Sequence, residues 1–303
     1  MQIPFRDGNY KILLMQCIVN RRAQFSASHR YWLPELSEIE NNQLFGLCTR
    51  FPGHGHNYVL FVSIAGELDK YGMVQNLSQV KQVIEREITS QLDFSYLNDV
   101  WQEFQQTLPT TESIAQVIWQ RLALHLPLVG VQLFEHPELW ADYQGNGMEA
   151  YLTISTHFSA AHRLAHPQLS NEENYEIYGK CARPNGHGHN YHLEVTVKGE
   201  IHPRTGMIVD LGVLNQVIED RVIEPFDHTF LNKDIPYFAE VVPTAENIAI
   251  HISNLLLSPI RELGVYLHKI KLIESPNNSC EIYCTESESS IAVANLSVKN
   301  LSH

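Results

Sequence analysis

The chain has 303 residues, of which 44% are hydrophobic and 18% charged, as expected for globular material long enough to form two domains. Its 34 acidic and 21 basic residues leave a net charge of −13, which argues against a nucleic-acid or anionic-membrane partner, because Lys and Arg bind phosphates. The five cysteines are few and odd in number, which indicates a reducing cytoplasm, and no apolar run approaches a membrane span in length.

The sequence repeats itself once. The segment from Phe25 to His29 returns as Phe158 to His162, and the segment Gly53-His-Gly-His-Asn-Tyr58 returns as Gly186 to Tyr191. His29 and His162 are 133 positions apart, as are His54 and His187, and the order of motifs is the same in both halves. We therefore predict two tandem domains, 1–147 and 148–303, with the boundary in a Gly-rich loop at 144–148.

Each copy is expected to run strand, strand, helix, helix, strand, strand. Residues 191–198 alternate as a half-buried strand does. Apolar residues recur at helical spacing over 211–222 and again over 248–255. We predict an α+β fold in which each copy is an antiparallel sheet with helices on one face.

The histidines form the clearest candidate site. His187 and His189 lie two positions apart at the start of a predicted strand, so both imidazoles should point to one face of the sheet. His162, at the end of the preceding strand, can supply a third ligand, and three histidines with an open fourth position are typical of catalytic zinc. The first half repeats this arrangement with its own three histidines, His29, His54 and His56.

These motifs resemble the 6-pyruvoyltetrahydropterin synthase family. The string Cys181-Ala-Arg-Pro-Asn-Gly-His-Gly-His-Asn-Tyr191 carries the resemblance, together with the Gly-Met, Asp-His and Pro-Thr-Ala-Glu-Asn motifs that follow it. The resemblance implies two T-fold domains, each a four-stranded antiparallel sheet with two helices on one face. It also implies zinc, a pterin substrate, and a homo-oligomer whose sheets close into a barrel, with active sites at domain or subunit interfaces.

The resemblance also implies roles for single residues in the second half. Cys181 would abstract a proton, and Asp227 and His228 would keep it reactive, although Cys181 alone could be an inert thiol and Asp227 a turn residue. Glu274 would anchor the pterin ring, or be a solvated strand charge. Thr244 and Glu246 would line the substrate pocket, although Thr244 also suits a helix N-cap, and the two roles can coexist.

The implied reaction converts 7,8-dihydroneopterin triphosphate to 6-pyruvoyltetrahydropterin with loss of triphosphate, as in tetrahydrobiopterin biosynthesis. Two alternatives stay open: a 6-carboxytetrahydropterin synthase of queuosine biosynthesis, which has the same fold and substrate, and a non-catalytic zinc- or pterin-binding ring. Five residues separate Cys181 from His187, and this spacing favours the pyruvoyl enzyme. Charge alone makes Lys180, Arg183 and Lys233 candidates for binding the triphosphate.

The first copy departs from the family pattern at one position. The residue that corresponds to His228 is Phe94, which cannot carry a proton. We therefore expect the first copy to bind zinc but to turn over poorly.

If the chain forms the three-unit rings that the resemblance implies, like domains would lie side by side, because two kinds of domain cannot alternate around a ring with an odd number of units. The first copy keeps possible remnant catalytic residues and possible substrate-binding residues, namely Cys48, Asp93, Thr110, Glu112 and Glu135.

Overall fold

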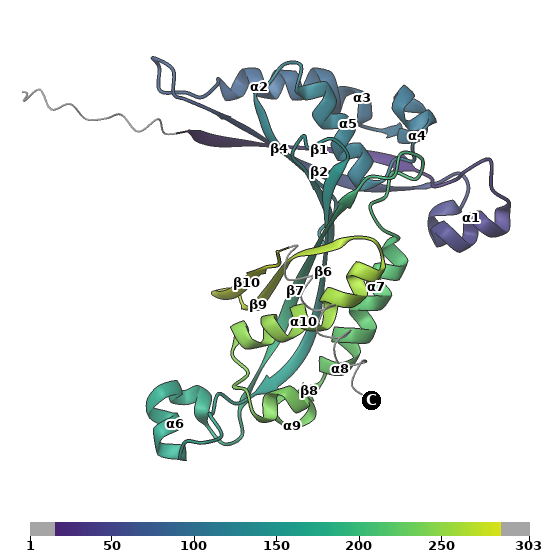
Figure 1. Ribbon diagram of the computed structural model, residues 1–303. Helices are drawn as coiled ribbons and strands as arrows, with labels where there is room; N and C mark the ends of the chain where they lie inside the picture. The colour runs from purple at the N-terminus through teal and green to yellow at the C-terminus, as the bar shows by residue number, and fades with distance from the viewer. Residues whose placement is uncertain (1–15, 286–303) are drawn as a thin grey trace, which may run out of the picture.

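A computed structural model describes residues 16–285. The first half supplies five strands, β1 to β5, and the second supplies β6 to β10 (Figure 1). The strands of the first half are β1 (Cys17–His29), β2 (His54–Gly66), β3 (Ser95–Tyr96), β4 (Leu128–His136) and β5 (Leu139–Tyr143). Those of the second are β6 (Glu149–His162), β7 (His187–Glu200), β8 (Thr229–Phe230), β9 (Tyr266–Ser275) and β10 (Asn278–Tyr283).

The helical elements also occur in matching order in the two halves. The first half contains α1 (Glu38–Phe45), η1 (Gly46–Thr49), α2 (Leu77–Ile84), η2 (Glu85–Thr89), α3 (Ser90–Leu92), α4 (Leu97–Val100), η3 (Gln102–Gln105) and α5 (Thr111–Leu122). The second contains α6 (Asn171–Tyr178), η4 (Gly179–Ala182), α7 (Leu211–Ile218), η5 (Glu219–Ile223), α8 (Glu224–Phe226), α9 (Leu231–Asp234), η6 (Pro236–Ala239) and α10 (Ala245–Glu262). The segments η2 and η5 are π-helical, and the other η segments are 3-10 helices.

All ten strands belong to one sheet. Its order is β10-β9-β7-β6-β5-β4-β2-β1-β3, and β8 pairs separately with β6. The main strands pair antiparallel, whereas the two-residue strands β3 and β8 pair parallel with β1 and β6. The α+β class is therefore confirmed. The sheet is open in residues 16–285, so closure into a barrel stays a prediction.

The two halves are joined edge to edge through β5 and β6. Leu139 lies opposite Ile154, and Asp142 lies opposite Tyr151. The predicted boundary at 144–148 falls in the turn between these strands, so this turn is a hairpin within a shared sheet. The expectation that like domains sit side by side is wrong at this junction, because a first half here adjoins a second half.

The core lies between one face of the sheet and the long helices. Strand alternation turns Tyr58, Leu60 and Val62 of β2 inward, and all three are fully buried. In the second half, Tyr191, Leu193 and Val195 of β7 are buried in the same way. Figure 1 shows α2 and α5 beside the strands of the first half and α7 and α10 beside those of the second. The predicted helices over 211–222 and 248–255 correspond to α7 with η5 and to α10.

Two short helices were not predicted. The helices α1 and α6 lie between the first and second strand of each half. Each begins with a capping box: Ser37 accepts a hydrogen bond from the Glu40 amide, and Ser170 accepts one from the Glu173 amide. A Ser three residues before a Glu is a visible signal for a helix start, and it occurs in both halves. These helices position the segments that carry Cys48 and Cys181, η1 and η4.

Candidate functional site

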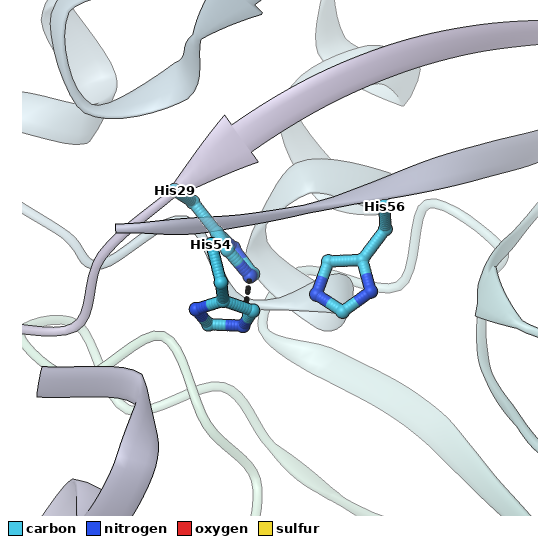
Figure 2. Close-up of side chains that lie close together, drawn as sticks. All are labelled: His29, His54 and His56. Atoms are coloured by element: carbon cyan, nitrogen blue, oxygen red, sulfur yellow. Dashed lines mark hydrogen bonds between the residues drawn. The ribbon is translucent and has the colours of Figure 1, made fainter. Parts of the chain in front are cut away.

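The three histidines of each half come together where two strands pair. His29 ends β1 directly opposite His54, and His56 lies opposite Ala27 on the same pair of strands. The same register places His162 opposite His187 and Ala160 opposite His189. Figure 2 shows the first set, with the rings of His29, His54 and His56 turned toward one another. In each set one ligand atom per residue lies within 4.8 Å of the others, so both sets can hold a metal ion.

Hydrogen bonds orient the central ring of each set. The Nδ1–H of His29 donates to the carbonyl of Pro109 at 2.9 Å, and that of His162 donates to the carbonyl of Pro243 at 2.8 Å. A carbonyl only accepts, so Nδ1 carries the proton and Nε2 presents its lone pair to the cluster. The Nε2 atoms of His29 and His54 are 3.1 Å apart, as are those of His162 and His187.

One ring in each set has a buried nitrogen without a hydrogen-bond partner among residues 16–285. His56 Nε2 and His189 Nε2 make no hydrogen bond with any of residues 16–285. Burying an unpaired polar atom is costly, so such atoms call for an explanation. A metal ion bound by the three imidazoles would satisfy both atoms, and the donor set of each site therefore fits such an ion.

Burial keeps the central imidazoles neutral. It lowers the pKa of both His29 and His162 from 6.5 to about 4. Burial also lowers the pKa of His56 and His187. A neutral imidazole is the form that binds metal, so these four rings are ready to coordinate at neutral pH.

A glutamate flanks each set of histidines. Glu135 Oε1, on β4, is 3.3 Å from His56 Nε2. Glu274 Oε1, on β9, is 3.7 Å from His189 Nε2 and 3.8 Å from His162 Nε2. Both carboxylates thus lie beside their histidine clusters. Glu135 Oε2 accepts a hydrogen bond from the Thr111 hydroxyl at 2.6 Å, and the Glu274 side chain is 16% exposed.

The two cysteines lie in matching segments after the short helices. The amide of Tyr31 donates to the Cys48 carbonyl at 3.0 Å, and the amide of Leu164 donates to the Cys181 carbonyl at 3.0 Å. Both cysteines are half-buried and free. Burial, and then the charge of Glu135, raises the pKa of Cys48. The charge of the carboxylate that flanks the first-half histidines thus disfavours the Cys48 thiolate.

Asp227 and His228 do not meet Cys181 within one chain. Asp227 Oδ1 accepts from the Ser159 amide at 2.7 Å, and Asp227 Oδ2 is 2.8 Å from His228 Nδ1. His228 lines an open pocket with Ser159 and Asn190, which alternate along their strands with the inward-facing residues. The pair therefore opens on the sheet face opposite the histidine cluster. No hydrogen bond joins Cys181 to His228 in the described part of the chain.

The corresponding pair of the first half has the same backbone. Asp93 Oδ1 accepts from the Ser26 amide at 2.8 Å, as Asp227 does from Ser159. Phe94 and His228 both have a positive φ, 55° and 58°. Phe94 is 90% exposed and lines a pocket that matches that of His228. The phenylalanine thus occupies the place of the imidazole without changing the loop.

The substrate-pocket residues behave differently in the two halves. Thr110 and Thr244 both cap their helices, as predicted for Thr244. Glu112 is buried, because a loop of the second half covers it and the Ile208 amide donates to its Oε1 at 3.1 Å. Glu246, its counterpart, is exposed. Within residues 16–285, the first site is thus covered and the second is not.

The covering loop is the functional element that sequence reasoning missed. Thr110 donates to the carbonyl of Gly206 at 2.5 Å, and Met207 packs against the cluster that contains Tyr31 and Cys48. The sequence signal for this loop is the Gly-Met motif, which occurs in both halves, but the sequence does not show which site each copy of the motif contacts.

Among the candidates for binding the triphosphate, Lys180 and Arg183 are exposed near Cys181, whereas Lys233 lies over the ring of Phe230.

Comparison with known proteins shows the family of this chain. The profile of the family described as 6-pyruvoyl tetrahydropterin synthase matches residues 18–146 and again 151–284. Because the two matches cover most of the chain, the chain belongs to this family.

Named relatives match about half of this chain and most of their own length. The 6-pyruvoyl tetrahydrobiopterin synthase of Homo sapiens is 46% identical over 134 residues, which are 44% of this chain and 91% of the human protein. A putative 6-carboxy-5,6,7,8-tetrahydropterin synthase of Archaeoglobus fulgidus is 31% identical over 44% of this chain and 96% of its own. The solved structure of Caenorhabditis elegans 6-pyruvoyl tetrahydropterin synthase is 36% identical, with a TM-score of 0.43, over 46% of this chain and 98% of its own.

Proposed function

We propose that this chain is a zinc-dependent lyase that converts 7,8-dihydroneopterin triphosphate to 6-pyruvoyltetrahydropterin with release of triphosphate, in tetrahydrobiopterin-type biosynthesis. The observation that carries the proposal is a cluster of three histidines with an unpartnered nitrogen, flanked by Glu274, in a chain 46% identical to the human 6-pyruvoyl tetrahydrobiopterin synthase over 91% of that protein's length. The carboxy-type relative is less similar, at 31% identity, so the pyruvoyl product is favoured.

The metal proposed for both sites is zinc. Three imidazoles with an open position suit a catalytic zinc ion, which when bound supplies a Lewis acid for the side-chain hydroxyls of the substrate. His162, His187 and His189 would hold one ion in the second half, and His29, His54 and His56 one in the first.

The protein's own groups would bind the pterin and move protons. Glu274 would accept two parallel N–H bonds from the pterin ring, for which a carboxylate is well shaped. Cys181 would abstract a proton from the substrate side chain, and His228, held by Asp227 at 2.8 Å, would relay protons. Because this pair opens on the opposite face of its own sheet, it would reach a cysteine only across an interface of a homo-oligomer.

The two halves would form two T-fold domains, 1–147 and 148–303, with unequal roles. The first would hold zinc and, through Glu135, Thr110 and Glu112, a pterin, but turn over poorly because Phe94 cannot carry a proton. Cys48 and Asp93 would be remnants of its catalytic set. We place the protein in the cytoplasm, where its five free cysteines would stay reduced. None of the described helices is long and apolar enough to cross a membrane.

The test is to incubate the purified protein with 7,8-dihydroneopterin triphosphate and identify the products by mass spectrometry. We expect the pyruvoyl product, zinc bound at two ions per chain by elemental analysis, and loss of turnover on chelation. C181A should lower turnover by at least about 10²-fold, and C48A, the matched control, far less. A carboxy product with acetaldehyde, or no turnover by the zinc-loaded protein, would refute the proposal, and a greater loss with C48A would reverse the roles of the halves.

A further inference from the structure

A pocket apart from the histidine sites lies on the polar face of the sheet, where the two halves join. Its volume is about 560 Å³, within the range of small-molecule sites, and it is lined by residues of β4 to β7, β9 and β10. On β6, Thr153 and Ser155 line the pocket. The alternate residues Leu152 and Ile154 are buried in the core, and His162 lies on their side of the strand. The pocket therefore opens on the face opposite the helices and the histidine cluster.

Two threonines form the floor of this pocket. Thr153 and Thr196 lie opposite each other on β6 and β7, and their hydroxyl oxygens are 2.9 Å apart. They are only 2% and 5% exposed, although they lie on the polar face. Longer side chains stand on either side, because Trp140 lies opposite Thr153 on β5 and Lys269 lies opposite Thr196 on β9. The pocket is thus a hollow with walls from both halves.

Aromatic rings make up part of these walls. The ring of Trp140 stacks on that of Phe134, with centroids 4.9 Å apart and an interplanar angle of 28°. On the other side of Trp140, the rings of Tyr151 and His268 meet edge to face at 4.7 Å. Trp140 is fixed by Phe134 yet only partly buried, so its ring can stack on a planar ligand.

Asp142 is the acid of the pocket. Its Oδ1 accepts a hydrogen bond from Gln132 Nε2 at 2.9 Å, and it forms no ion pair with any of residues 16–285. Burial raises the pKa of Asp142 from 3.8 to about 6, although hydrogen bonds from Gln132 and Trp140 and the charge of Lys269 oppose this rise. The group is still mostly ionised at neutral pH. An ionised carboxylate can accept about four hydrogen bonds, so Asp142 can also accept from a ligand.

Lys269 is the cation of the pocket. Its Nζ lies 5.8 Å from the centre of the Tyr283 ring, and it makes no ion pair within the described residues 16–285. The neighbouring Lys271 differs, because its Nζ is 3.6 Å from Glu194 and is thereby neutralised. Lys269 is therefore the cation of this pocket whose charge is available to an anionic group.

The sequence repeat does not reproduce this pair of charges. Asp142 corresponds to Glu281, whose Oε1 is 3.9 Å from Lys271 Nζ, and Lys269 corresponds to Gly130. The unpaired acid thus comes from the first half and the unpaired cation from the second. They line one pocket because β5 and β6 join the halves, so each chain offers this combination once.

We propose that this pocket binds a phosphorylated heterocycle whose ring edge carries two neighbouring N–H donors, as guanine nucleotides and phosphorylated pterins do. Asp142 accepts the two N–H bonds, Trp140 stacks on the ring, and Lys269 binds the phosphate. Such a ligand carries its ring edge and its phosphate at opposite ends, as the pocket carries Asp142 on β5 and Lys269 on β9. One molecule binds per chain, and it leaves both histidine clusters free.

Isothermal titration calorimetry with guanosine 5′-monophosphate (GMP) tests the site without using activity. We expect one GMP per chain. D142N and K269M should each weaken binding by about 10-fold or more, because the first sets an amide N–H against the ring N–H groups and the second removes the cation. D142N keeps an acceptor for Gln132 and should fold, which circular dichroism checks. K70M, which removes an exposed lysine of the first half, is the matched control and should bind as the wild type does. No binding of GMP, or wild-type affinity in D142N and K269M, would overturn the proposal.

Further titrations identify the ligand and separate this pocket from the histidine sites. Adenosine 5′-monophosphate, which lacks the paired N–H edge, and guanosine, which lacks the phosphate, should each bind at least about 10-fold more weakly than GMP. Titration with 7,8-dihydroneopterin monophosphate distinguishes a pterin from a nucleotide, since the tighter of the two ligands is the natural class. E135Q/E274Q, in which both carboxylates beside the histidines are replaced, should bind GMP as the wild type does. Equal binding of the adenine nucleotide, or loss of GMP binding in E135Q/E274Q, would overturn the proposal.

Discussion

The buried Glu112 should make folding stability depend on pH. Burial raises its pKa from 4.5 to about 7, although hydrogen bonds from backbone amides, including that of Ile208, oppose this rise. Glu112 then binds its proton more tightly in the folded chain than in the unfolded chain, so its contribution to stability is greatest below pH 4.5 and is lost as the pH rises through 7. The difference corresponds to about 3 kcal/mol at pH 8. Glutamine in this place keeps an acceptor for the Ile208 amide and carries no charge.

The assay is urea denaturation of the metal-free protein from pH 4.5 to 8 at one protein concentration. E112Q should match the wild type near pH 4.5 and exceed its free energy of unfolding by up to about 3 kcal/mol at pH 8. Titration of the histidines is common to both proteins and cancels in the difference. E85Q, a change at an exposed glutamate of the same half, should follow the wild-type curve. If E112Q stays parallel to the wild type, Glu112 is not a buried acid with a raised pKa, and our account of the covered site is wrong.

Two further substitutions address the junction and the catalytic asymmetry. G206A should lower the free energy of unfolding by about 2–4 kcal/mol in urea, because its Cβ would lie 2.5 Å from a backbone carbonyl. G147A, where φ is +69° and the surroundings within residues 16–285 are open, should cost only about 1 kcal/mol, and an equal cost would refute close docking. F94H should place an imidazole beside Asp93 and raise the initial rate in an H228F background, where loss of the relay costs about 10²-fold or more. An unchanged rate in that background would show that Phe94 is not what limits the first half.

The histidine sites could be predicted from sequence because they depend on local geometry. A spacing of two within a strand puts His187 and His189 on one face whatever the rest of the fold does. His162 joins them because β6 and β7 are neighbours along the chain and pair antiparallel. The exact repeat of this pattern as His29, His54 and His56 made the inference stronger than a single cluster would allow.

The junction between the halves could not be predicted in this way. Whether Gly206 docks on its own half or on the other depends on which strand edges pair, and β5 could in principle pair with β6 or with a strand of another copy. Alternation patterns describe the faces of a strand, whereas its edges are backbone groups that every sequence shares. The face of the sheet on which the His228 side chain lies could not be predicted either, because a single residue with positive φ turns the chain there.

Duplication makes the two kinds of interface unequal. The junction inside the chain forms at no cost in association entropy, and it carries the only pairing of Arg204 with Glu35. An interface between copies must form by association, and across it Asp227 and His228 would reach a cysteine. Activity would then depend on protein concentration, whereas the cover of the first-half site by residues 201–210 would not.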